Sequence, residues 1–122
     1  LFSQRHGLQS VAFNNKIWII GGREEDAYRN DVWNSEDGVT WTNVLDSASF
    51  PNAYYEIADV YKEKIWIIGG GEMIWYSGDG TNWNQGLSTS GFSGRDEHSS
   101  VVFDDKLWII GGSNRNDVWY LK

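Results

Sequence analysis

The sequence predicts an all-β protein, and three copies of one short stretch are the main reason. Residues 17–22, 65–70 and 107–112 each combine Ile or Leu with a Trp and end in two glycines. Runs of this kind are typical of buried strands that end in a sharp turn. The composition agrees, with 16% aromatic residues and 14 glycines. Both faces of each run are apolar, so we expect sheets stacked face to face.

A first strand and a two-residue turn are expected before each repeated stretch. The lead-in segments 5–16, 53–64 and 95–106 each contain an apolar stretch, two polar residues and a lysine. This pattern predicts hairpins with turns at residues 14–15, 62–63 and 104–105. A third strand is expected after the glycines, at residues 30–33, 72–75 and 116–119.

A fourth strand is expected in two of the three units. Ser35–Trp41 and Ser77–Trp83 share the pattern Ser-x-Asp-Gly-x-x-Trp. Asp-Gly favours a primed turn because glycine accepts a positive φ, and Trp41 and Trp83 are placed in the strands that follow. The sequence therefore predicts one domain, 1–122, with two complete four-stranded units and one without its outer strand. The unit boundaries are 5–52, 53–94 and 95–122.

The differences in length between units are confined to one loop. Ile17 and Ile65 are 48 residues apart, and Ile65 and Leu107 are 42 apart. The loop after the double glycine has seven residues in the first unit, 23–29, and Gly71 alone in the second. Four strands in a period of about 40–50 residues are typical of a β-propeller.

The chain resembles kelch repeats over essentially its whole length. The resemblance lies in the double glycine after the second strand, the tryptophan of the fourth strand, and an arginine opening the first. The Asn-Asp-Val-Trp and Ser-x-Asp-Gly-x-x-Trp patterns are similar to the bacterial branch of the family. The hairpin also resembles the Asp-box of sialidases but lacks one residue, and we interpret it as a shared turn without sialidase activity. Structural roles are expected for Gly21, Gly22, Gly69, Gly70, Gly111, Gly112, Trp18, Trp66, Trp108, Trp41, Trp83, Asp31 and Asp117.

Three propeller blades would leave two apolar blade faces in water. Exposed apolar patches beyond a few hundred Å² seldom lack a partner, and closed rings have roughly four to eight blades. We therefore expect the remaining blades of a parent chain or a second copy of this chain. A head-to-tail homodimer with six blades is favoured, a number that resembles known kelch rings.

Two arginines and two aspartates suggest paired charges. Arg5 and Arg95 open the first strands of units one and three, and Asp31 and Asp117 lie in their third strands. In unit two both positions change together, to Ala53 and Met73. Joint loss favours an ion pair, because removing both partners strands no buried charge. The alternative is that the arginines bind an anion or acidic peptide, since the resemblance implies a peptide-binding face at the start of the first strands.

Other candidate binding residues lie in the loops and near the channel. The long loop is the best contact candidate because insertions at one loop position map to one face. Glu56 and Asp59, with Tyr54 and Tyr55, are candidates for a polar pocket by the channel. The full set of candidates for binding a partner is Arg5, His6, Arg23, Tyr28, Arg29, Tyr54, Tyr55, Glu56, Asp59, Arg95, His98 and Arg115.

The composition excludes several classes of function. A net charge of −7 argues against nucleic acid as a partner, which would require a basic patch. The absence of cysteine excludes disulfides, thiolate metal sites and a copper radical oxidase of the galactose oxidase type, whose crosslinked cofactor needs a cysteine. His6 and His98 are the only histidines and lack ligand-spaced carboxylates, so we expect no metal and no cofactor. No apolar run approaches a membrane span, and a soluble protein is expected, with an extracellular bacterial location as one option.

Three functional hypotheses follow. The first is a kelch-type module that binds a protein or glycan through loops on one face. The second is part of an enzyme acting on sugars, such as a mutarotase or glycosidase, although no base with an orienting partner and no carboxylate pair is recognisable. The third is an excised or engineered fragment kept for its ability to assemble, because the chain begins at Leu1 without a methionine and ends at a different phase of the repeat.

Overall fold

The chain folds into three antiparallel β-sheets. The computed structural model describes all residues except 53–55, 70–72, 87–91, 93 and 122. The described residues form strands and connecting turns, and none lies in a helix long and apolar enough to cross a bilayer. The strands are β1 (Gln9–Phe13), β2 (Lys16–Arg23), β3 (Tyr28–Ser35), β4 (Thr42–Leu45), β5 (Ile57–Tyr61), β6 (Lys64–Gly69), β7 (Met73–Ser77), β8 (Asn84–Gln85), β9 (Ser99–Phe103), β10 (Lys106–Ile110) and β11 (Val118–Leu121).

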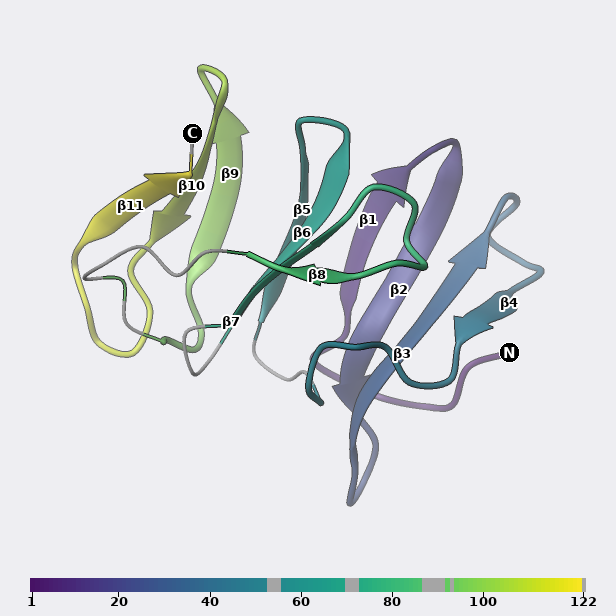
Figure 1. Cartoon of the computed structure of the whole chain (residues 1–122). Coiled ribbons are helices and arrows are strands. Elements are labelled where there is room, and N and C mark those ends of the chain that lie inside the picture. The colour runs from purple at the N-terminus through teal and green to yellow at the C-terminus, as the bar shows by residue number, and fades with distance from the viewer. Residues whose placement is uncertain (53–55, 70–72, 87–91, 93, 122) are drawn as a thin grey trace.

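The sheets follow one another in chain order (Figure 1). The first sheet has the order β1-β2-β3-β4, the second β5-β6-β7-β8, and the third β9-β10-β11. Two four-stranded units and a three-stranded one are therefore confirmed. The inner strands β1, β5 and β9 are adjacent, and the outer strands lie at the other side of each sheet.

The first two strands of every sheet are joined by the predicted two-residue turn. Both turn residues have positive φ values in each case, at Asn14–Asn15, Lys62–Glu63 and Asp104–Asp105. This conformation is that of a type I′ turn, whose twist matches the flanking strands. The register is the same in all three hairpins, with Phe13↔Lys16, Tyr61↔Lys64 and Phe103↔Lys106 closing them.

The sheets pack face to face through two apolar cores. Trp18 and Ile20 of the first sheet meet Ile65 and Ile67 of the second. The opposite face of the second sheet, with Ile68, meets the third in the same way. Both faces of the second sheet are thus covered, as the apolar runs predict.

The second glycine of the repeated pair allows the first strand to approach closely. Gly22 has φ +102°, and a Cβ there would lie 3.0 Å from the Cβ of Leu8. Gly112 has φ +89°, and its Cβ would lie 2.7 Å from the Cβ of His98. Any side chain would collide with the start of the first strand. Gly70 lies outside the described residues.

Two local predictions are wrong in detail. Trp41 and Trp83 precede β4 and β8 and are not part of them. The Asp-Gly turns are not primed, because only the glycine of each has a positive φ, as at Gly38 with +77°. Their shape comes instead from side chains: Ser35 Oγ accepts from Gly38 N–H at 2.9 Å, and Asp37 Oδ1 accepts from Thr40 N–H at 2.7 Å. Hydrogen bonds from the backbone N–H groups of Thr40 and Val39 lower the pKa of Asp37 to about 2.

The seven-residue loop is also shorter than predicted. The ladder of β2 and β3 continues to Arg23↔Tyr28, so only residues 24–27 lie outside the strands. The inserted residues lengthen a hairpin, which projects from one end of the first sheet (Figure 1).

Candidate binding surface

Two candidate arginines form bidentate ion pairs within their own sheets. Arg5 donates from Nη1 to Asp31 Oδ1 at 2.6 Å and from Nη2 to Oδ2 at 3.1 Å. Arg95 makes the same contacts with Asp117 at 2.5 and 3.0 Å. The joint change to Ala53 and Met73 in the second unit fits this pairing.

Further hydrogen bonds fix each pair in place. Arg5 Nη1 also donates to the Gly21 carbonyl at 3.0 Å, and Trp33 Nε1 donates to Asp31 Oδ2 at 2.9 Å. The side chain of Arg5 is only 2% exposed, and that of Arg95 is fully buried. Hydrogen bonds from Arg95 and from Trp119 hold the pKa of Asp117 well below its usual range. Both guanidinium groups are therefore buried and hydrogen-bonded to their aspartates.

The projecting hairpin carries a second cluster of charges. Arg29 donates to Glu24 at 2.5 Å, and Ser3 Oγ donates to the other carboxylate oxygen of Glu24. These hydrogen bonds, with the nearby arginines, lower the pKa of Glu24 to about 2. The Arg23 guanidinium lies 5.3 Å from the Tyr28 ring centroid, and Tyr28 is 46% exposed. Exposed aromatic and charged groups thus lie on the projecting hairpin, which the sequence analysis predicts as a contact site.

His6 is placed beside this hairpin by its backbone. Its N–H donates to the Arg23 carbonyl at 3.0 Å, and its own carbonyl accepts from Arg23 N–H at 2.8 Å. This bridge extends the first sheet beyond β1, and the residue itself is exposed.

A buried polar group, Glu56, lies just before β5. Glu56 and His98 stand at equivalent positions of their units, where the first unit has Leu8. Glu56 is 1% exposed, and neither carboxylate oxygen has a hydrogen-bond partner among the described residues. Burial raises its pKa to about 7, and the charge of Asp96 adds to the rise.

His98 is buried beside the neighbouring sheet. Its Nε2 lies 3.0 Å from the Ile68 carbonyl and donates to it. Burial lowers the pKa of His98, and the positive charge of Arg95 acts in the same direction. The imidazole is therefore neutral near pH 7 and joins the two sheets.

Asp59 lies on the inner wall formed by β1, β5 and β9. Its Oδ2 accepts a hydrogen bond from Ser100 Oγ of the neighbouring strand. Ser10 and Val101 line the same shallow surface. The predicted pocket of Glu56 and Asp59 is only partly described, because Tyr54 and Tyr55 lie outside the described residues.

Sequence reasoning missed Asp96 and Ser100, which act as neighbours of Glu56 and Asp59. In the alignment of the units, Asp96 is equivalent to His6 and Ser100 is equivalent to Ser10. The repeat alone therefore gave no sign of their roles. Arg115 is exposed in the loop before β11. Ligand binding by any of the candidate residues stays a prediction. Within the described residues, no group of three or more potential ligands is placed to hold a metal ion.

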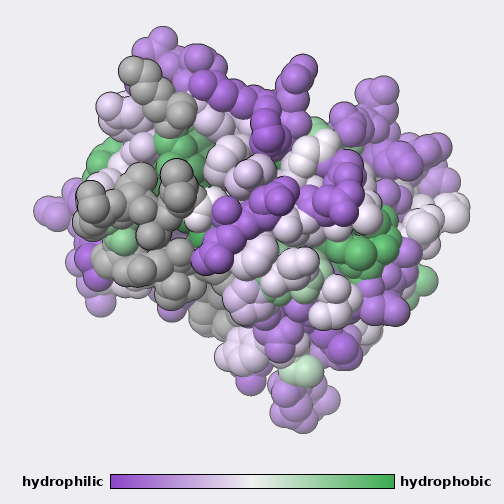
Figure 2. Space-filling view, viewed as in Figure 1, coloured by the Kyte–Doolittle hydropathy of each residue, from purple (hydrophilic) through white to green (hydrophobic). Residues whose placement is uncertain are grey.

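Figure 2 shows that hydrophilic residues cover most of one side of the molecule. Hydrophobic residues reach the surface in this view only as separate patches. Contacts on this side would therefore be mainly polar.

The fold and this surface define an all-β protein of repeated, stacked antiparallel sheets. No family model matches the chain. The chain is similar to the Kelch repeat protein M-T8 of Myxoma virus (strain Lausanne), with 39% identity over 64 residues. The match covers 50% of this chain and 12% of the viral protein, so the chain spans a small part of that protein's length. The similarity and the fold are consistent with kelch-like repeats.

Proposed function

We propose that this chain is a kelch-type binding module that closes with a second copy of itself into a ring of six sheets. One observation carries the proposal: the third sheet exposes the apolar face that the first sheet buries and the second sheet buries in large part. We call this face the tryptophan face. In the third sheet it consists of Val101, Phe103, Trp108, Ile110, Val118 and Tyr120, which the strand registers place on one side.

The tryptophan face is buried in the first sheet and exposed in the third. Phe13, Trp18 and Ile20 are 7%, 4% and 0% exposed. Their equivalents Phe103 and Ile110 are 69% and 44% exposed. A patch of this kind on an isolated molecule is a typical interaction site.

The opposite face of the first sheet supplies the matching surface. We call it the isoleucine face, and in the first sheet Ile17 is exposed on it whereas Ile19 on the same side is 6% exposed. Ile17 is 42% exposed, whereas its equivalents Ile65 and Leu107 are 0% exposed because a tryptophan face covers them. Within the described residues, the chain thus contains two tryptophan-to-isoleucine contacts and one exposed or partly exposed face of each kind. Two copies can pair these faces head to tail, which closes a ring.

The proposed partner of the ring is a protein bound at the end where the charged hairpin projects. Tyr28 and Arg115 are exposed there, and tyrosine and arginine are the residue types enriched at protein interfaces. No catalytic role is proposed for Glu56, since a general acid must reach its substrate and this side chain is 1% exposed.

Sedimentation equilibrium of the purified chain tests ring closure. We expect twice the monomer mass at micromolar concentration. Ile110→Lys places a charge in the tryptophan face and should give a monomer, whereas Asn84→Lys adds the same charge on exposed β8 and should stay dimeric. A folded wild-type chain that sediments as a monomer at high concentration contradicts the proposal.

A further inference from the structure

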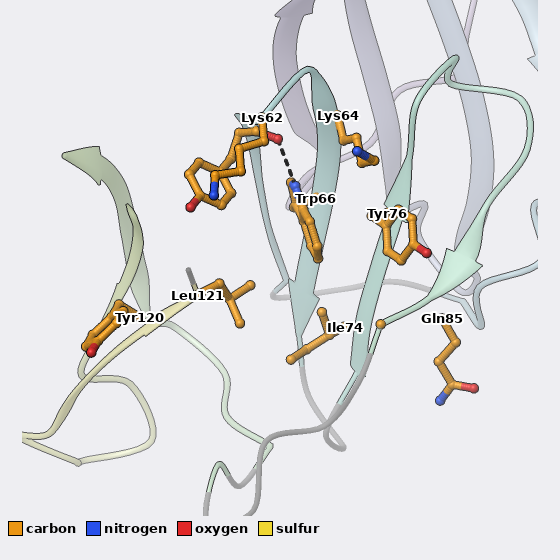
Figure 3. A pocket seen from close by; sticks show the side chains of 10 residues that line it. Lys62, Lys64, Trp66, Ile74, Tyr76, Gln85, Tyr120 and Leu121 are labelled. Carbon is orange, nitrogen blue, oxygen red and sulfur yellow. Dashed lines mark hydrogen bonds between the residues drawn. The ribbon is translucent and has the colours of Figure 1, made fainter. Parts of the chain in front are cut away.

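A cavity lies between the second and third sheets. It has a volume of about 600 Å³ and is open to solvent. Figure 3 shows its lining, with Trp66 of β6, Ile74 and Tyr76 of β7, and Leu121 of β11 around the space. Trp66 Nε1 donates to the Tyr61 carbonyl at 3.0 Å, which fixes the indole in the wall.

The equivalent space beside Trp18 is filled by a hairpin of the next sheet. Trp18 is 4% exposed, and a Cβ added to Gly80 would lie 2.3 Å from its ring. Gly80 belongs to the Ser77–Trp83 turn that leads into β8, and Trp83 is 7% exposed in the same core. Trp66 occupies the same position in its sheet as Trp18, yet it is only half-buried. The cavity is the space that a Ser-x-Asp-Gly-x-x-Trp hairpin occupies at the other interface.

The backbone beside the cavity is ready to pair with a strand. Among the described residues, β11 pairs with β10 alone. In the second sheet the equivalent strand, β7, pairs with β8 through Trp75↔Gln85 and Tyr76↔Asn84. Beyond these pairs, Gly86 N–H donates to the Ile74 carbonyl at 2.7 Å. Val118 stands where Ile74 does, so its carbonyl is the expected acceptor for an added strand.

The charge at the rim suits an acidic hairpin. Lys62 and Lys64 both line the cavity of a chain whose net charge is −7. The aspartate of the hairpin motif is ionised, since hydrogen bonds from Asn82 and Thr81 lower the pKa of Asp79 to about 2.

We infer that the cavity is an acceptor site for a Ser-x-Asp-Gly-x-x-Trp hairpin and its following strand, donated in trans by another polypeptide. The donated glycine packs on the Trp66 ring, the tryptophan fills the apolar space, and the strand pairs with β11. The third sheet then has four strands, like its neighbours. Pairing of the tryptophan and isoleucine faces is a separate event, since Tyr120 alone of the six residues of the third sheet's tryptophan face lines this cavity.

A synthetic peptide with the sequence of residues 76–86 tests the site by isothermal titration calorimetry. We expect one peptide to bind per chain. A peptide with Trp83→Ala and a peptide with sarcosine in place of Gly86 should each bind at least tenfold more weakly. The first loses the buried indole, and in the second an N-methyl group replaces the N–H that pairs with the strand. The Ile110→Lys chain should bind the unmodified peptide normally, even if ring closure fails or does not occur.

Two chain variants locate the peptide. Trp66→Ala removes the wall on which the glycine packs, and Leu121→Arg places a charged side chain in the cavity at the end of β11. Either should weaken binding at least tenfold, so one folded variant is sufficient. Absence of binding at millimolar peptide, or equal affinity for the sarcosine peptide, overturns the inference.

Discussion

At the scale of single residues, the Arg5–Asp31 pair places two charges in the interior of a small sheet. Their side chains are 2% and 10% exposed, and two hydrogen bonds join them. Loss of one partner of a buried pair typically costs about 3–5 kcal/mol, because the other charge stays buried and unpaired. Loss of both has no such penalty. In the second unit, Ala53 and Met73 replace the arginine and the aspartate, so both charges are absent together.

A double-mutant cycle at this pair measures the effect. We expect Asp31→Met to lower the free energy of unfolding by about 3 kcal/mol. The Arg5→Ala/Asp31→Met double variant should lose less than the sum of the two single variants, by at least about 1 kcal/mol. Urea unfolding monitored by tryptophan fluorescence gives the four values. Additive losses would show that the two side chains contribute independently.

Glu56 should make stability depend on pH. Its pKa is about 7 in the folded protein, against 4.5 for the ordinary side chain. The folded state therefore binds the extra proton, and stability falls as pH rises from about 4.5 through 7. A shift of this size corresponds to at most about 3 kcal/mol. Glu56→Gln should remove this fall, as measured by urea unfolding at pH 4.5, 6 and 8. Parallel pH profiles of the two proteins would contradict the assignment.

At the scale of elements, Gly38 and Gly80 occupy the same position in the equivalent turns of the first and second sheets. Their φ values are +77° and +81°, so the strain from an added Cβ is similar. The surroundings differ: the nearest atom is Ile17 Cδ1 at 3.7 Å for Gly38, but the Trp18 ring at 2.3 Å for Gly80. We expect Gly80→Ala to cost about 1–3 kcal/mol more than Gly38→Ala because it overpacks the interface. Unfolding of both in the monomeric Ile110→Lys background provides the comparison, and equal losses would contradict it.

The repeat determined most of the elements that could be predicted from sequence. Short apolar runs and two-residue polar turns placed the first three strands of each unit, because these features are local. The position of Trp83 before β8 was not predictable in the same way, since Ser77 and Asp79 extend the turn through side-chain hydrogen bonds. The cavity beside Trp66 depends on a contact between two sheets and is seen only when equivalent interfaces are compared in the structure.

At the scale of the whole molecule, the two cores make the stack directional. Each contact joins a tryptophan face to the isoleucine face of the next sheet, and the direction never reverses. A contact of this head-to-tail kind either closes into a ring or continues without limit. The rotation between adjacent sheets therefore decides whether two copies form a closed dimer or longer assemblies, and a defined sedimentation mass would indicate closure.

The proposed closure predicts which side chains meet across the two copies. By analogy with Trp18 and Gly80, Trp108 of one copy should pack on Gly38 of the other. Trp108→Ala should weaken association at least about thirtyfold, equivalent to about 2 kcal/mol for a buried interface tryptophan. Gly38→Ala should also raise the dissociation constant, whereas Gly80→Ala, at the internal interface, should act mainly on unfolding. Sedimentation equilibrium gives the constants. A dimer whose dissociation constant is unchanged by both Trp108→Ala and Gly38→Ala must be held by other surfaces.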